Sequence, residues 1–314
     1  MAIAFVFPGQ GSQSVGMGKP LAEAFVHARE VFEEVDSALG QGLSDVIWNG
    51  PAETLVLTEN AQPALMAMSI AVMRVLEAEA GVDLARDVAC VAGHSLGEYS
   101  ALAAAGALSI ADAARLLRVR GRAMQKAVPV GVGAMAALVG VELDQATAIA
   151  AEAASAGVCA AANDNGGGQV VLSGEKVAVE RAVEIAKAQG VRRAMMLAVS
   201  APFHCSMMQP AADAMAEALA QVTVQPPRVP LVANVRAAPI ADPAEIVRSL
   251  VEQVTGTVRW RESVQSMAQN GVTAFYEIGA GRVLAGLIKR IVENAETSSI
   301  GTPDDVARFK AARG

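Results

Sequence analysis

The segment DVACVAGHSLGEYSA, residues 87–101, decides the fold. Its first six residues form an apolar run typical of a buried strand, and the residues from Gly97 onward look helical. The GHSLG stretch between them fits the sharp strand-to-helix turn that exposes a nucleophilic serine. In such a turn the main-chain N–H of Leu96 points into the same space as the Ser95 hydroxyl, where it can stabilise an oxyanion. The alternative is a purely structural turn, because a chain with 28 glycines contains glycine-spaced serines by chance.

A serine nucleophile needs a general base, and the chain has three histidines. His27 lies in a charged helical segment and is predicted to be a surface residue. His94 adjoins Ser95, and neighbours on a sharp turn point apart, so we expect His94 to line the pocket. His204, in the loop sequence SAPFHC, is then the candidate for the base.

The group that orients His204 is harder to identify. Asp164, Glu175 and Glu184 lie between Ser95 and His204, in the chain order that α/β-hydrolases use. None of the three is compelling, because all fall in a segment that we predict to be an insertion. A main-chain carbonyl or an amide is the alternative, and it would make the pair a Ser–His dyad.

Composition argues against several classes of protein. The 314 residues are 53% hydrophobic and 18% charged, with a net charge of −7 and a pI near 5.1, so nucleic acid is not an expected partner. Three widely spaced cysteines without a metal-ligand pattern indicate a reduced, cytoplasmic protein. No signal peptide is expected, and no membrane association, since the longest uncharged stretch, 194–212, contains two prolines and a histidine.

The hydrophobic pattern predicts an α/β protein in two parts. Apolar runs typical of parallel strands buried on both faces occur at 2–7, 87–92, 229–234 and 274–279. Helical patterns occur at 19–38, 60–80, 97–106, 109–127, 207–221 and 280–291. Residues 128–197 instead read as β-α-β-β-α-β, the ferredoxin-like order. We therefore predict a catalytic domain of residues 1–127 and 198–314, with an inserted subdomain at 128–197.

Five motifs occur in an informative order. They are FVFPGQGSQ at 5–13, GHSLGEY at 93–99, VRGRAMQ at 119–125, NDNGGGQVVLSG at 163–174 and SAPFHC at 200–205. Together they resemble the malonyl-CoA:acyl-carrier-protein transacylases of bacterial fatty-acid synthesis. The resemblance implies an α/β-hydrolase-like large domain with a parallel sheet and an inserted ferredoxin-like small domain. It also implies a monomer that needs no metal or redox cofactor.

The resemblance assigns roles around the turn. It implies that Ser95 is the acylated nucleophile and His204 the base, with an oxyanion hole formed by the main-chain N–H groups of Gln10 and Leu96. It also implies that the main-chain carbonyl of Gln253, in VEQVTGTVRW, orients His204.

The resemblance further selects one arginine. Arg115, Arg118, Arg120 and Arg122 are not distinguishable from the sequence alone, whereas the VRGRAMQ match gives Arg120 the malonyl carboxylate, which a guanidinium can bind through two hydrogen bonds. Further expected pocket residues, on weaker grounds, are Gln62, His94 and Asn163. Phe203 is an aromatic residue where many family members have a small polar one, and it suggests either a small acyl group or a purely structural role.

The implied reaction moves a malonyl group from malonyl-CoA to the phosphopantetheine thiol of acyl carrier protein through a malonyl-serine. The expected partners are therefore the CoA thioester and acyl carrier protein. Acidic carrier proteins would dock on local basic clusters, for which the candidates are Lys187, Arg192, Arg193, Lys289 and Arg290. Three alternatives differ in function: a serine hydrolase such as a thioesterase, the malonyl transferase of a malonate decarboxylase, and a non-catalytic docking module.

Overall fold

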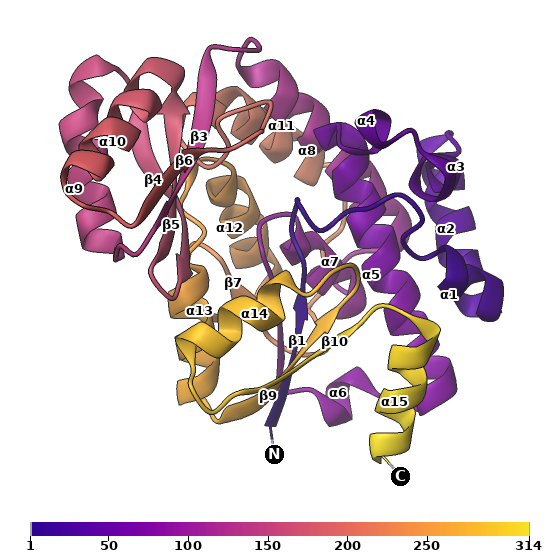
Figure 1. Cartoon of the computed structure of the whole chain (residues 1–314). Coiled ribbons are helices and arrows are strands. Elements are labelled where there is room, and N and C mark those ends of the chain that lie inside the picture. The colour runs from indigo at the N-terminus through magenta and orange to yellow at the C-terminus, as the bar shows by residue number, and fades with distance from the viewer. Residues whose placement is uncertain (1, 314) are drawn as a thin grey trace.

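The computed structural model describes residues 2–313, which form two sheets and the helices around them (Figure 1). The larger sheet has six strands in the order β10-β9-β1-β2-β7-β8. Its strands are β1 (Ala2–Phe7), β2 (Cys90–Gly93), β7 (Leu231–Ala233), β8 (Ala238–Ile240), β9 (Val272–Ile278) and β10 (Glu296–Ile300). All neighbours pair in parallel except β7 and β8. The apolar β1 lies between β9 and β2, which explains its uninterrupted hydrophobic sequence.

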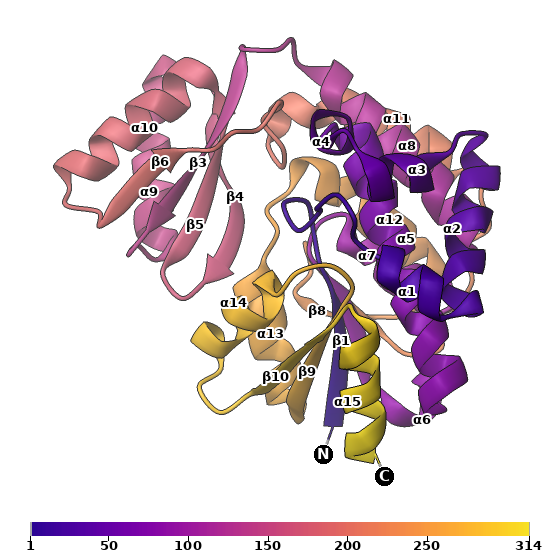
Figure 2. The same cartoon turned by 45° about the vertical axis from the view of Figure 1, so that its right-hand side comes forward.

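Helices flank this sheet (Figures 1 and 2). In the first part of the chain they are α1 (Lys19–Ala24), α2 (Val26–Leu39), α3 (Leu43–Asn49), α4 (Ala52–Leu55), α5 (Thr58–Ala80), α6 (Leu84–Asp87), α7 (Gly97–Ala104) and α8 (Ile110–Ala127). In the last part they are α11 (Gln209–Leu219), α12 (Pro243–Thr255), α13 (Trp260–Gln269), α14 (Val283–Ile291) and α15 (Pro303–Arg313). Strands that alternate with helices give the α/β architecture that the sequence predicts.

The second sheet is antiparallel and has the strand order β4-β5-β3-β6. Its elements follow one another as β3 (Gly133–Val139), α9 (Leu143–Ala153), β4 (Cys159–Gly166), β5 (Gln169–Glu175), α10 (Lys176–Ala188) and β6 (Arg193–Met196). Helices α9 and α10 pack together on one face of this sheet (Figure 1). The predicted β-α-β-β-α-β order is thus confirmed, while the exact limits 128 and 197 of the inserted subdomain stay a prediction.

Two predicted elements are wrong in part. The helix expected at 19–38 is two helices, because Phe25 is extended, with φ −131° and ψ 123°. The strand expected at 87–92 begins only at Cys90, because the preceding residues form the short helix α6, which the Asp83 side chain caps at its N-terminus. Seven further elements were not predicted from the sequence, namely α3, α4, β8, α12, α13, β10 and α15.

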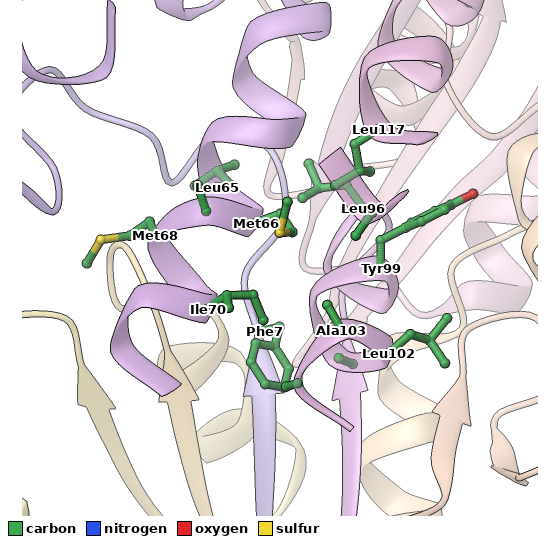
Figure 3. Close-up of a cluster of buried hydrophobic side chains, with 14 of the residues drawn as sticks. Phe7, Leu65, Met66, Met68, Ile70, Leu96, Tyr99, Leu102, Ala103 and Leu117 are labelled. Atoms are coloured by element: carbon green, nitrogen blue, oxygen red, sulfur yellow. The ribbon is translucent and has the colours of Figure 1, made fainter. Parts of the chain in front are cut away.

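The core beneath the GHSLG turn is built from β1, α5, α7 and α8 (Figure 3). Every residue of α7 is buried, so this helix is a central element rather than a surface one. In Figure 3, Leu96 and Leu102 belong to the same apolar cluster as Leu65 and Met66 of α5 and Phe7 of β1. The turn therefore stands on a packed and rigid base.

Hydrogen bonds hold the antiparallel sheet against the loop that follows α12. Val258 N–H donates to the carbonyl of Ala162 at 2.9 Å, and Asp164 N–H donates to the carbonyl of Val258, also at 2.9 Å. The buried Asp164 carboxylate accepts a hydrogen bond from Arg261 of α13 at 2.8 Å. These contacts place the antiparallel sheet opposite the ends of β1 and β2, with the face that α9 and α10 leave uncovered toward those ends.

Candidate active site

The GHSLG turn is as sharp as the sequence requires. A Cβ atom on Gly93 would lie 1.9 Å from the main-chain carbon of Gly97, and one on Gly97 would lie 2.3 Å from the main-chain oxygen of Phe7. Neither position can hold a side chain. Ser95 itself has φ +53°, in the left-handed region that non-glycine residues rarely adopt. The turn thus lifts the Ser95 side chain off the end of β2.

Ser95 lies next to His204. The Ser95 Oγ and His204 Nε2 atoms are 2.8 Å apart, and His204 Nδ1 lies 2.8 Å from the main-chain oxygen of Gln253. Because a carbonyl only accepts hydrogen bonds, Nδ1 must carry the proton and Nε2 is free to accept from the Ser95 hydroxyl. In this arrangement Gln253, on α12, occupies the place that an acid takes in a triad. Asp164 pairs instead with Arg261.

Arg120 is the arginine that reaches this serine. Its Nη2 donates to Ser95 Oγ at 3.1 Å and to Gln253 Oε1 at 2.9 Å, and its Nη1 donates to Gln62 Oε1 at 2.9 Å. The side chain is only 1% exposed. These bonds fix the guanidinium beside the Ser95 hydroxyl, with its partners all neutral.

Local packing explains why Arg120 can reach the site from α8. A Cβ atom on the next residue, Gly121, would lie 2.5 Å from Glu59 Cα, so the glycine lets α8 cross closely over the start of α5. The neighbouring arginines have other partners: Arg115 bonds the carbonyl of Ala38, Arg118 bonds Asn60, and Arg122 bonds Glu59.

Ser95 opens into a cavity of about 380 Å³ between the two sheets. All nine candidate residues except Gln253 line it: Gln10, Gln62, His94, Ser95, Leu96, Arg120, Asn163 and His204. Apolar side chains form much of the remaining wall, among them Met124, Met135, Val171, Leu197 and Phe203. Gln253 lies behind this wall, fully buried. A narrow and largely apolar chamber with a few polar groups is typical of a small-molecule site.

The His94 side chain lies against β4 and α13. Its Nε2 lies 2.9 Å from Asn165 Oδ1 of β4, and its ring packs beside Trp260. Burial lowers the pKa of His94, so the ring is neutral. His27 is also placed as predicted, since it lies half exposed on α2 beside Glu30.

A buried hydrogen-bond network that no sequence motif indicated lies beneath the turn. Asn234, just after β7, accepts the Ser95 N–H at 2.8 Å through Oδ1 and donates to the carbonyl of Gly93 at 2.7 Å. Glu98, in the first turn of α7, accepts the N–H of Asn234 at 2.8 Å. Gln253 joins both residues through its side-chain amide. The one sequence signal was the position of Asn234 at the end of a strand next to β2, where parallel sheets place their sites.

Burial and one charge set the protonation state of His204. Burial first, and then the positive charge of Arg120, lower the pKa of His204 to about 3. His204 is therefore neutral at physiological pH and ready to accept a proton. Burial lowers the pKa of Arg120 as well, but from a value so high that the guanidinium keeps its charge.

Comparison with known proteins agrees with this geometry. Residues 4–305 match the model of the acyl transferase domain. The chain is 46% identical over 304 residues to the malonyl CoA-acyl carrier protein transacylase of Escherichia coli strain K12, covering 97% of each chain. The malonyl CoA-acyl carrier protein transacylase of Bacillus subtilis strain 168 is 44% identical, over 97% of this chain and 95% of that protein.

The chain belongs to the malonyl-CoA:acyl-carrier-protein transacylase family.

Solved structures of transacylases in this family share the whole fold. The acyl-carrier-protein S-malonyltransferase of Bartonella henselae superimposes with a TM-score of 0.97 at 55% identity, over 99% of both chains. A malonyl-transacylase solved in complex with its type II polyketide acyl-carrier protein superimposes with a TM-score of 0.95 at 41% identity, over 99% of this chain and 100% of that one. The predicted fold and family are thereby confirmed.

Residues 2–313 contain no cluster of three or more His, Cys, Asp or Glu side chains arranged to hold a metal ion. No helix within the same residues combines the length and the apolar character that crossing a bilayer demands.

Proposed function

We propose that this chain transfers a malonyl group from malonyl-CoA to the phosphopantetheine thiol of acyl carrier protein, with Ser95, His204 and Arg120 as its working residues. The observation that carries the proposal is the Ser95 hydroxyl, held 2.8 Å from a neutral histidine and 3.1 Å from a buried guanidinium. The first contact supplies a nucleophile, and the second supplies a partner for the carboxylate that distinguishes malonyl from acetyl.

In the first half-reaction, His204 Nε2 takes the Ser95 proton while Oγ attacks the thioester carbon of malonyl-CoA. The main-chain N–H groups of Gln10 and Leu96 stabilise the oxyanion. The carbon–sulfur bond then breaks, and the protonated His204 returns its proton to the CoA sulfur. Arg120 exchanges its hydrogen bond to Ser95 for the malonyl carboxylate, while Gln62 and Gln253 keep the guanidinium in place.

In the second half-reaction, the phosphopantetheine thiol gives its proton to His204 and attacks the malonyl-serine ester. The carbon–oxygen bond breaks, and the proton passes from His204 to the Ser95 oxygen. This sequence needs no metal or redox cofactor. The apolar walls, to which Phe203 contributes, favour the thiol over water and limit the size of the acyl group. His94 and Asn163 complete the polar lining around the acyl chain.

The test is the mass of the intact protein after mixing with malonyl-CoA. We expect one malonyl adduct that disappears when holo-acyl-carrier protein is added and that never forms on Ser95→Ala. An adduct that water removes as fast as the carrier protein does would make the chain a hydrolase. Adduct formation on Ser95→Ala would refute the assignment of the nucleophile.

We propose a basic rim at the mouth of the cavity as the docking site for the carrier protein. Arg290 lines the cavity, and its side chain packs on Gly167 in the β4–β5 turn. Arg192 packs on Gly140, which contacts the same turn through Gly168. The two arginines therefore flank one turn, where they can meet an acidic partner.

Charge reversal tests this rim. Arg192→Glu and Arg290→Glu should each raise KM for the carrier protein about tenfold and leave KM for malonyl-CoA unchanged. Arg181→Glu on α10, an exposed arginine on the helix that covers the opposite face of the sheet, is the matched control. Equal effects on both substrates would contradict the docking role.

We further propose that the chain acts as a cytoplasmic monomer, since one chain contributes every group of the mechanism.

A further inference from the structure

The mechanism gives no role to Glu98, a buried acid in contact with Gln253. Glu98 is 0% exposed, yet both of its carboxylate oxygens accept N–H groups: Oε1 from the main chain of Asn234 at 2.8 Å, and Oε2 from the side-chain amide of Gln253. Burial raises the pKa of Glu98 to about 8, while these two donors and the charge of Arg120 act in the opposite direction. Two donors aimed at two oxygens suit the ionised carboxylate.

The Gln253 amide connects Glu98 to the site. Its Nε2 contacts Glu98 and donates to the main-chain oxygen of Ser95 at 2.9 Å, while its Oε1 accepts from Arg120 at 2.9 Å. An amide can be turned over, which would exchange its oxygen and nitrogen. With Glu98 ionised, the turned amide would set its oxygen against a carboxylate and its NH₂ against a guanidinium. Glu98 therefore acts together with the Ser95 main-chain oxygen to determine which end of the amide faces Arg120.

We propose that Glu98 is a positioning residue, which acts through the Gln253 side chain to aim Arg120 at the malonyl carboxylate. The inference rests on the proposed role of Arg120. The Glu98 carboxylate also provides a counter-charge for the buried Arg120 guanidinium before substrate binds, and the Gln253 amide lies between the two charges. Buried charges need such compensation, but a direct carboxylate contact would compete with the substrate for the same N–H groups. The intervening amide keeps Arg120 oriented and still available.

The test uses Glu98→Gln, which keeps the shape but has only one acceptor oxygen for two N–H donors. We expect the ratio of kcat/KM for malonyl-CoA over acetyl-CoA to fall at least tenfold at pH 8.5, mainly through KM for malonyl-CoA. Acetyl-CoA has no carboxylate for Arg120, so a general structural defect would lower kcat/KM for both donors equally, whereas a misplaced Arg120 lowers it for malonyl-CoA alone. An unchanged ratio, whether both rates fall or neither does, would overturn the proposal.

Gln253→Met provides the second arm. It removes the amide but keeps the main-chain carbonyl that contacts His204, so the ratio should fall as in Glu98→Gln. In the double variant the two losses should not add, because both changes act on one contact. A retained ratio in Gln253→Met, or additive losses, would overturn the relay. If Glu98→Gln does not fold, Gln253→Met alone decides.

Arg120→Ala separates this inference from the function on which it rests. If Arg120→Ala keeps the ratio, the proposed role of Arg120 fails, and the role of Glu98 fails with it. If Arg120→Ala loses the ratio and Glu98→Gln retains it, only the role of Glu98 is refuted.

Discussion

Replacing Arg120 by alanine should convert a malonyl-selective enzyme into a poor and unselective one. The guanidinium is buried beside the nucleophile and bonds only neutral groups, so its charge is free to pair with an incoming carboxylate. In Arg120→Ala that carboxylate would have to enter the same buried site without a partner. Acetyl, which has no carboxylate, is spared this loss.

The size of the effect follows from the burial. Breaking a buried charge pair by removing one partner costs about 3–5 kcal/mol, and each 1.4 kcal/mol is about a factor of ten. The ratio of kcat/KM for malonyl-CoA over acetyl-CoA should therefore fall roughly 100- to 4,000-fold. The rate of acylation by acetyl-CoA should not fall through any loss of basicity at His204. The Arg120 charge lowers the pKa of His204, so its removal raises that pKa.

Rapid-quench mass spectrometry of the acyl-enzyme with each donor measures this ratio directly. Arg122→Ala is the matched control, because Arg122 is exposed, pairs with Glu59 and lies one residue beyond Gly121 on the same helix. Thermal unfolding of both variants checks that the fold is intact. A ratio that changes less than about threefold in Arg120→Ala, or that changes equally in Arg122→Ala, would refute the reasoning.

Two further predictions concern the base and the turn. Because the pKa of His204 is lowered to about 3, this histidine stays neutral down to acid pH. With acetyl-CoA, whose acyl group has no carboxylate for Arg120, the rate of Ser95 acylation should therefore change less than about twofold between about pH 8 and about pH 5. A pH–rate profile for this donor that falls with a midpoint near 6.5 would contradict the lowered pKa of His204. Gly97→Ala places a Cβ atom 2.3 Å from the main-chain oxygen of Phe7, so it should destabilise the protein by about 3 kcal/mol or more and abolish acylation; a melting temperature equal to that of the parent protein would contradict it.

The fold was predictable where the hydrophobic pattern is strong and local. The apolar run at 2–7 and the long helix at 60–80 are both present, as β1 and α5. The misses are segments whose structure depends on tertiary contacts. Strand β10 reads ETSSI and owes its conformation to pairing with β9, and the polar helix α15 packs on the fold with little more than Val306 and Phe309. Phe25 interrupts the first predicted helix without any glycine or proline to signal it.

Within the site, the motifs lead to the groups that line the cavity but not to those behind it. Ser95 and His204 carry chemistry that a short sequence can suggest. Glu98 and Asn234 lie 136 residues apart and have meaning only as a contact. Gln253 was predicted for its main-chain carbonyl, whereas its side-chain amide joins Arg120, Ser95 and Glu98. Such a role depends on three elements meeting, which no local pattern encodes.

The two residues that we propose for the proton transfer both have positive φ, +53° at Ser95 and +59° at His204. A side chain in this region costs about 1–3 kcal/mol, whereas glycine adopts it freely. Laboratory evolution for heat resistance alone would therefore favour Ser95→Gly, and would enrich well-folded but inert proteins. A thermostable version of this enzyme has to be selected by turnover, because at Ser95 folding and chemistry demand opposite residues.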